Sequence, residues 1–255
     1  MNIICLNIWG GRAGKDQLLA FFEQERDSTD IFCLQEVWSD RYEFLEGALA
    51  GGVAITHDTI MSHAFQDISA VLPDHVPYFR PSFLHSYGLC MFIHKDLNVL
   101  DEGDVFVHFE RGYVPEGDVG NHARNMQFAT VETSNGPRTI LNIHGLWNGK
   151  GKSDSDERLA QSDRIIEFIS SLENPFVLCG DFNLTPDSES LRKIEYAGHR
   201  NLISEYGITS TRTSLYSKPE RYADYAFVSE GIEVIDFEVL PDEVSDHSPL
   251  RIQIA

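Results

Sequence analysis

Four short polar segments, each with a carboxylate, lie far apart in the chain beside apolar, strand-like runs. They read LQEV at 34–37, GDFN at 180–183, YADY at 222–225 and SDH at 245–247. Where a buried strand runs into a loop, a rigid sheet can present side chains to solvent. Carboxylates beside apolar residues are costly to bury alone, and Mg²⁺ is the simplest shared partner because it favours carboxylate and amide oxygens. The pattern predicts a metal-dependent hydrolase acting on a phosphate ester.

Two residues at strand edges are the first metal candidates. Glu36 follows the apolar run 31–34, so we expect its backbone to be held rigidly. Asn7 lies inside a buried strand, where its amide needs partners, and a metal-bound water or a carboxylate would serve. Each has a plain structural alternative: a strand-end cap for Glu36, and a hydrogen bond to a neighbouring loop for Asn7.

Asp181 and Asn183 are two residues apart, so in extended backbone both side chains would point to the same side. Asp181 would then orient and deprotonate a water molecule, while Asn183 would donate to a non-bridging phosphate oxygen. The structural alternative is an Asx-turn ahead of Pro186.

Two histidines stand at predicted strand edges. His247 precedes Ser248-Pro249, and the proline favours extended backbone before it, which suits a fixed imidazole. Asp224 could accept from one of its ring nitrogens and so fix the tautomer. His144 ends the strand 141–143. A purely structural role is the alternative for either histidine.

Three basic residues could contact a phosphate. Arg124 begins a strand at 125–131 and could clamp a phosphate with its guanidinium, or form a surface ion pair. Lys150 and Lys152 lie in WNGKGK, whose order is not that of a P-loop. We interpret that segment as a flexible rim that helps to bind the leaving group, with a solvated turn as the alternative.

The elements that must position these residues follow from periodicity and turn signals. We expect strands at 2–8, 31–34, 86–94, 98–109, 126–132, 139–144, 175–179, 222–228, 232–240 and 250–254, and helices at 15–26, 42–50, 157–172 and 186–195. Helices fall between groups of strands rather than after each one, which predicts an α+β sandwich with helices on the outer faces. Without a linker-like stretch, residues 1–255 are expected to form a single domain.

Composition limits the partners. The 255 residues carry a formal net charge of −20, which counts against tight, salt-driven duplex binding. A phosphate substrate is still compatible, because a bound cation can reverse the local field. The cysteines sit in apolar runs without metal-binding spacing, so Cys5, Cys33, Cys90 and Cys179 are expected to be buried free thiols. No leader pattern or membrane-spanning run is present, and we expect a cytoplasmic protein.

Taken together, the segments resemble the endonuclease/exonuclease/phosphatase superfamily, whose members share the deoxyribonuclease I fold. The matching pieces, in family order, are LN at 6–7, QEV at 35–37, NIH at 142–144, GDFN at 180–183, ADY at 223–225 and SDH at 245–247. The resemblance implies a four-layer α/β/β/α sandwich, with two mostly antiparallel sheets flanked by helices. It also implies hydrolysis of a phosphodiester or phosphomonoester by in-line attack of water.

The same resemblance implies a role for each residue. Mg²⁺, with Mn²⁺ as the alternative, would be bound by Glu36 with Asn7 and Asp246; Asp181 and Asn183 would handle water and phosphate; His247 would pair with Asp224; and His144 and Arg124 would contact the phosphate or the leaving oxygen.

Two other functions stay open at this stage. The first is a DNA or RNA nuclease of the same fold that holds nucleic acid weakly. The second is a catalytically silent binding module, against which the full set of polar residues argues. The segments GLW at 145–147 and TRTS at 211–214 resemble a bacterial subgroup for which no substrate can be named.

Overall fold

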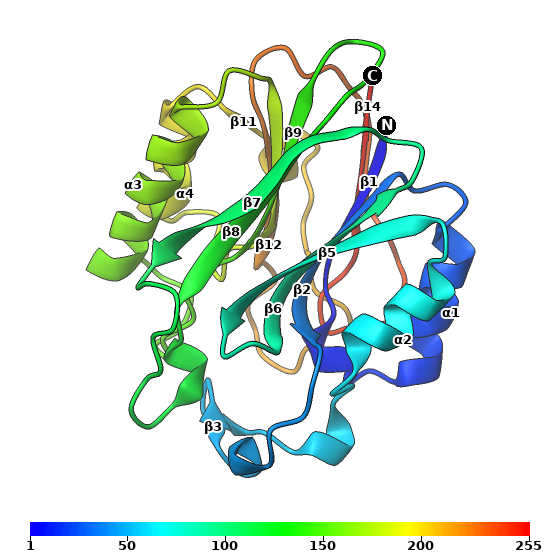
Figure 1. The fold of residues 1–255 in the computed structure, drawn as a ribbon. Coiled ribbons are helices and arrows are strands. Elements are labelled where there is room, and N and C mark those ends of the chain that lie inside the picture. The colour runs from blue at the N-terminus through cyan, green and yellow to red at the C-terminus, as the bar shows by residue number, and fades with distance from the viewer.

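Two six-stranded sheets lie face to face in the computed structural model, which describes residues 1–255 (Figure 1). In spatial order the first contains β13 (Val234–Val239), β14 (Leu250–Ile254), β1 (Asn2–Asn7), β2 (Ile31–Trp38), β6 (Tyr87–His94) and β5 (His75–Phe83). The second contains β11 (Arg200–Asn201), β12 (Asp224–Val228), β10 (Phe176–Asp181), β9 (Arg138–His144), β8 (Arg124–Val131) and β7 (Val99–His108). Only β1 with β2 and β9 with β10 pair in parallel. The sheets are therefore mostly antiparallel, as predicted.

Helices cover the outer face of each sheet, as Figure 1 shows. The first sheet carries α1 (Lys15–Glu25) and α2 (Ala64–Val71), and the second carries α3 (Asp156–Ser170) and α4 (Glu189–Tyr196). A short α5 (Leu202–Glu205) follows β11, and single 3-10 turns occur at Trp9–Gly11, Glu43–Leu45, His57–Thr59 and Val119–Asn121. The four-layer α/β/β/α sandwich is confirmed.

The central strands are apolar on both faces because each face is covered. In β1, Ile3 and Cys5 belong to the core between the sheets, whereas Ile4 and Leu6 pack toward the helices. This alternation is the two-residue period of a strand. The four cysteines are buried and unpaired.

The predicted helix at 42–50 is wrong. Only one 3-10 turn forms, at Glu43–Leu45, and it is followed by the two-stranded ribbon of β3 (Leu49–Ala50) and β4 (Val53–Ala54). Gly47 adopts φ 79°, which a helix does not tolerate, and the Glu46 carboxylate accepts from the backbone and the ring of His57. The local signal for a helix is therefore overridden by a left-handed glycine and a side-chain contact.

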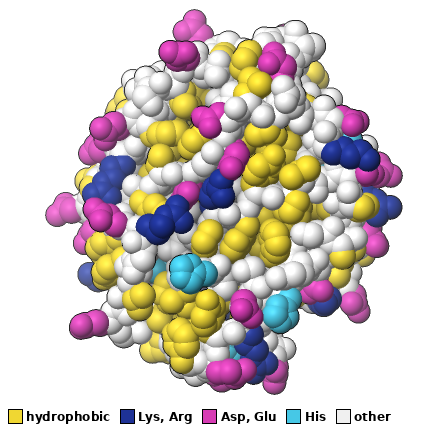
Figure 2. Space-filling view, in the orientation of Figure 1, with side chains coloured by type: hydrophobic (Ala, Val, Ile, Leu, Met, Phe, Trp, Pro, Cys, Tyr) yellow, Lys and Arg dark blue, Asp and Glu magenta, His cyan; other side chains and the backbone are white.

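Acidic side chains are more common than basic ones on the face in Figure 2, in keeping with 40 acidic against 20 basic residues. Hydrophobic side chains gather over the β3 region, where Phe44, Leu49 and Val53 are exposed. None of the helices combines the length and apolar character needed to cross a bilayer.

Candidate active site

A cavity of about 270 Å³ opens at one edge of the sandwich and contains most of the predicted site residues. Those that line it are Glu36, Arg124, His144, Asp181, Asn183, Asp246 and His247. Asn7 and Asp224 lie directly behind this lining and hydrogen-bond to it. All nine predicted residues therefore converge. A larger cavity of about 860 Å³, between the end of β7 and α3, includes none of them.

Glu36 is presented by a bulge in β2 rather than by the end of a strand. The register of β2 with β6 shifts between Leu34 and Val37, and Glu36 adopts φ 60°. A bulge re-aims a side chain, and left-handed backbone at a non-glycine residue is strained. β2 continues past Glu36 to Trp38, so the predicted strand end at Leu34 was too early.

Asn7 holds two carboxylates together. Its Nδ2 donates to Oε1 of Glu36 at 3.2 Å and to Oδ2 of Asp181 at 3.0 Å. Its Oδ1 accepts from the backbone N–H of Trp9 at 2.9 Å. The amide nitrogen thus faces the carboxylates of Glu36 and Asp181, while the amide oxygen faces the backbone of Trp9.

Asp181 and Asn183 are brought together by a turn. The backbone N–H of Asn183 donates to Oδ1 of Asp181 at 2.8 Å, and Asn183 adopts φ 55°. The prediction of extended backbone at these residues was wrong. They form the Asx-turn that was the structural alternative predicted from the sequence. Both side chains nevertheless line the cavity, so the turn is how the fold delivers them.

Gly180 allows β10 to reach the cavity. A Cβ at this position would lie 2.0 Å from the carbonyl oxygen of Ile143 on β9. Its φ of 150° is also rarely adopted by other residues. The close approach of β9 and β10 places His144 in register with Asp181.

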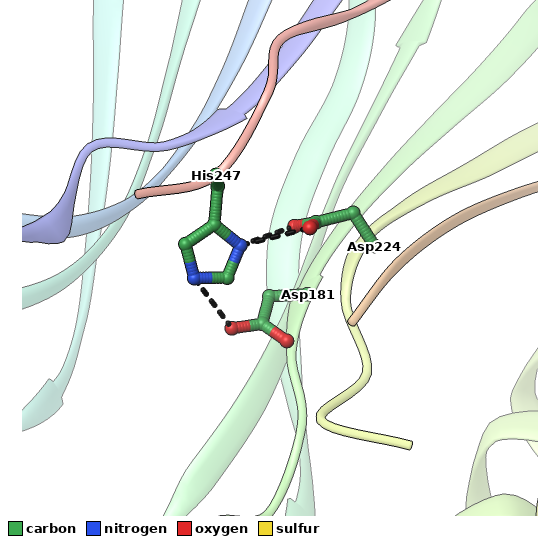
Figure 3. A group of neighbouring side chains, drawn as sticks. All are labelled: Asp181, Asp224 and His247. Atoms are coloured by element: carbon green, nitrogen blue, oxygen red, sulfur yellow. Dashed lines mark hydrogen bonds and ion pairs between the residues drawn. The ribbon is translucent and has the colours of Figure 1, made fainter. Parts of the chain in front are cut away.

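His247 stands between two carboxylates (Figure 3). Its Nδ1 lies 2.9 and 2.8 Å from the two oxygens of Asp224, and its Nε2 lies 3.6 Å from Oδ2 of Asp181. Burial opposes protonation of the ring, as does Arg212, but Asp224, Asp246 and Asp181 outweigh both and raise the His247 pKa above its ordinary value. The structure contains the predicted hydrogen-bonded pair of His247 and Asp224.

The pKa values of two cavity carboxylates, Glu36 and Asp181, are shifted in opposite directions. Burial raises the pKa of Glu36, with Arg12 opposing it. Burial acts the same way on Asp181, but His247, His144 and Lys152 outweigh it, and the Asp181 pKa falls well below its ordinary value. Asp181 is therefore ionised at neutral pH, while a cationic partner would offset the burial that raises the pKa of Glu36.

His144 is a neutral imidazole at the end of β9. Its Nε2 lies 3.8 Å from Oδ2 of Asp181 and 3.9 Å from Oε1 of Glu36. Burial, together with the nearby Arg124, lowers its pKa to about 3. The ring can donate or accept a hydrogen bond without adding charge.

Arg124 is buried rather than paired at the surface. It is 2% exposed, and its Nη2 donates to the carbonyl of Gly120 at 2.9 Å. Its Nε and Nη1 have no partner, although almost all buried polar groups in proteins have one. The guanidinium therefore offers two donors that suit an anion in the cavity.

Two further cations line the cavity, and the sequence connected only Lys152 with the site, as part of a rim. Nη1 of Arg212 donates to Oδ2 of Asp246 at 3.1 Å, and its guanidinium lies 4.0 Å from the ring centre of Tyr216. Lys152 is 4% exposed, so its assignment to a flexible rim was wrong; its Nζ donates to the carbonyl of Tyr222. Burial and Arg212 lower the Lys152 pKa to about 8. Both residues lie in loops, outside the named helices and strands, so no apolar strand in the sequence indicates their position.

The donors fit a hard cation beside Glu36 and Asp246. Oδ1 of Asp246 is buried without any hydrogen-bond partner, and carboxylate oxygens suit Mg²⁺ or Mn²⁺. One ligand atom each from Asp181, Asp224 and His247 also lie within 4.8 Å of one another. In that group, however, His247 Nδ1 is hydrogen-bonded to both oxygens of Asp224, so that ring nitrogen is already engaged. Glu36 and Asp246 line the same cavity and offer carboxylate oxygens outside that group.

Comparison with known proteins identifies the family and the fold. The model of the Endonuclease/Exonuclease/phosphatase family matches residues 4–247. A search of curated proteins finds no match.

Solved structures share the fold at low sequence identity. A mannosyl-6-phosphatase from Bacteroides thetaiotaomicron is 17% identical with a TM-score of 0.74, and the match covers 100% of this chain and 99% of that one. A functionally unknown conserved protein from Enterococcus faecalis is 19% identical, with a TM-score of 0.73 and coverage of 100% and 99%. TDP2 from D. rerio, complexed with a single-strand DNA product, is 15% identical, with a TM-score of 0.70 and coverage of 100% and 98%.

Proposed function

This chain belongs to the endonuclease/exonuclease/phosphatase family, whose members hydrolyse phosphoesters, and on that premise we propose that it is a divalent-metal-dependent phosphoesterase. Residues 1–255 would form one catalytic domain, with Mg²⁺ as the ion and Mn²⁺ as the alternative. The observation that carries the proposal is the meeting, in one cavity, of an ionised Asp181, the His247–Asp224 pair and a buried Arg124 with free donors.

Asp181 is proposed to orient the attacking water. Its lowered pKa keeps it ionised, so it can accept a hydrogen bond from the water and take up its proton transiently as the new P–O bond forms. Asn183 lines the same cavity and would donate to a non-bridging phosphate oxygen. The bond from phosphorus to the leaving oxygen breaks, and that oxygen takes up, through solvent, the one proton that the attacking water lost, so the products are an alcohol and a phosphate and Asp181 is ionised again. Fixed donors and charges of this kind supply most of the acceleration in such sites.

The remaining groups stabilise charge and position. Asp224 fixes the ring of His247, whose Nε2 faces Asp181. His144 and Arg124 would contact the phosphate or the leaving oxygen. A divalent ion held by Glu36 and Asp246 would neutralise charge on the phosphate and the leaving group.

A Mg²⁺-dependent screen of phosphomonoesters, phosphodiesters and nucleic acids tests the proposal. We expect turnover by the natural protein, with a loss of about a hundredfold or more in Asp181→Asn and in His247→Ala, since general-base and charge-stabilising groups contribute on that scale. Circular dichroism should show an unchanged fold. Near-normal turnover in both variants would contradict the assignment. Cleavage of nucleic acid that falls steeply with added salt would favour the nuclease alternative.

Metal binding has its own test. Glu36→Gln should weaken Mg²⁺ binding and lower turnover together, because it removes one of the two carboxylates proposed to hold the ion. Isothermal calorimetry with Mg²⁺ alone measures the first effect, and Asp27→Asn, which alters a carboxylate that is 91% exposed, serves as the control. Unchanged Mg²⁺ affinity in Glu36→Gln would place the ion elsewhere.

A further inference from the structure

The cavity is basic although the protein is strongly acidic. Its lining includes five basic side chains, Arg12, Arg124, Lys152, Arg212 and Lys218, against three carboxylates, Glu36, Asp181 and Asp246. The chain as a whole has a net charge of −20. A divalent ion would raise the local positive excess further. Such a site is suited to a substrate that carries more than one negative charge.

Several of the buried donors lack a partner within the protein. Nε and Nη1 of Arg124 and Nε of Arg212 are buried and make no hydrogen bond. A buried donor without a hydrogen-bond partner costs free energy, and the planar guanidinium group matches the geometry of phosphate oxygens. A phosphomonoester dianion offers three non-bridging oxygens, whereas a diester offers two and carries only one charge. The number of free donors and the charge excess both favour the monoester.

A continuous wall bounds the cavity on one side. The Asp118 carboxylate accepts from the backbone N–H groups of Gly51, Gly52 and Gly120 at 2.7, 2.7 and 2.8 Å, which fixes the turn between β3 and β4. A Cβ on Gly51 would lie 2.2 Å from Nε1 of Trp147, so the indole lies directly against this glycine. A Cβ on Gly120 would likewise lie 2.4 Å from the nitrogen of Gly51.

On this side the cavity is bounded, which leaves less room for a second substituent on a bound phosphate. Ala50, Gly51, Val53, Val119 and Trp147 all line the cavity. A strand of nucleic acid bound through an internal phosphate must leave the site in two directions, whereas a monoester extends in only one. The remaining space is bounded by the buried or half-buried apolar rings of Trp38, Phe83 and Tyr87, which suit a compact organic group.

We propose that the substrate is a compact organic phosphomonoester, bound as its dianion, rather than a phosphodiester or a nucleic-acid strand. This rests on the proposed function. The reaction takes ROPO₃²⁻ and water to ROH and HPO₄²⁻: one P–O bond forms to the water oxygen, one breaks to the alcohol oxygen, and no oxidant or reductant takes part. Arg124 and Arg212 hold the phosphate oxygens, and the apolar rings receive the alcohol.

Two esters with the same leaving group test the proposal on the natural protein. p-Nitrophenyl phosphate and methyl p-nitrophenyl phosphate differ by one methyl group and one negative charge. At about pH 8 the monoester is a dianion, because the second pKa of a phosphate ester is about 6. With Mg²⁺ present, and after correction for the uncatalysed rates, kcat/KM should favour the monoester at least about tenfold, the scale of one lost hydrogen bond to a charged group.

A variant isolates the role of the free donors. Arg124→Met removes them with similar side-chain length, and it should lower kcat/KM for the monoester at least about tenfold more than for the diester. Arg192→Met, which alters an exposed arginine of α4, should leave both values unchanged.

The outcomes separate the two proposals. Equal or better hydrolysis of the diester, or cleavage within a closed circular DNA, would overturn the monoester assignment while leaving a phosphoesterase. A ratio unaffected by Arg124→Met, with both activities retained, would overturn the role of its donors. Absence of Mg²⁺-dependent hydrolysis across both esters and the wider screen would defeat the proposed function itself.

Discussion

Several of the reactive side chains are held in place by a polar residue behind the cavity lining. Asn7 bridges Glu36 and Asp181, and Asp224 fixes the ring of His247 with both carboxylate oxygens. The sheets are also linked behind the site, because Nε2 of Gln35 donates to Oδ1 of Asn142 at 2.7 Å. Side chains supported in this way keep their geometry without a bound ligand.

Asp224→Asn tests this support. The substitution keeps the shape but removes the charge beside His247 Nδ1, so the ring loses its charged hydrogen-bond partner. We expect kcat to fall by about 10- to 100-fold, the usual effect of losing a residue that orients a functional side chain. Steady-state kinetics on the best substrate of the screen measures it, with Asp27→Asn as control. A kcat within twofold of the natural protein would show that Asp224 has no orienting role.

The family motifs located the strand-edge residues, because a carboxylate or imidazole beside an apolar run stands out in the sequence. Arg212, in TRTS, and Lys152, in WNGKGK, have no apolar run beside them that would place them at a strand edge. They reach the cavity from loops, and only the fold shows that the loops converge there. The orientation of Asn7 was also beyond the sequence, since it depends on which of its amide atoms the backbone of Trp9 engages.

At the level of elements, buried strands were predicted well and irregular ones were not. β5 was not predicted because it contains Pro77 and Pro81, which break a strand pattern; as the edge of its sheet it tolerates them. The bulge at Glu36 was also missed, because its neighbours continue the apolar run. The alternation of apolar and polar residues along a strand indicates which of its faces is buried. The position of a bulge or of a sheet edge depends instead on how the strand pairs with its neighbour.

Gly180→Ala should destabilise the fold through the contact between β9 and β10. The new Cβ would meet the Ile143 carbonyl at 2.0 Å, and backbone cannot yield as a flexible side chain can. We expect a loss of about 3 kcal/mol or more in the free energy of unfolding, measured by urea denaturation. Gly198→Ala is the matched control, because its φ is 96° but nothing lies within 4 Å of its Cβ position. Equal losses would mean that backbone strain alone is responsible.

For the whole molecule, buried neutral histidines couple folding to pH. Burial, with Arg124 adding to it, lowers the pKa of His122 well below 6.5, that of His108 to about 4 and that of His144 to about 3. Each is neutral when folded and takes up a proton on unfolding once the pH drops below its unfolded value. The unfolded state then binds more protons than the folded state, so the free energy of unfolding decreases as the pH is lowered.

We therefore expect the free energy of unfolding to decrease from pH 6.5 toward pH 4, by up to about 1.4 kcal/mol per pH unit for each of these histidines. The raised pKa of His247 contributes stability that is already complete below 6.5, so it does not offset this loss. Urea denaturation across this range, with a chelator present, measures the slope. His122→Phe should reduce the slope, whereas replacement of the exposed His63 by Gln should not. A slope unchanged by His122→Phe would contradict the account.

All three tryptophans of the chain, Trp9, Trp38 and Trp147, line the same cavity. The indole emission of this protein therefore comes entirely from the walls of one binding site, with no background from elsewhere. The Lys218 ammonium lies 5.2 Å from the centre of the Trp147 ring, and an anion that displaced it would alter that indole's surroundings directly. Ligands can thus be titrated by intrinsic fluorescence, without labels and without turnover.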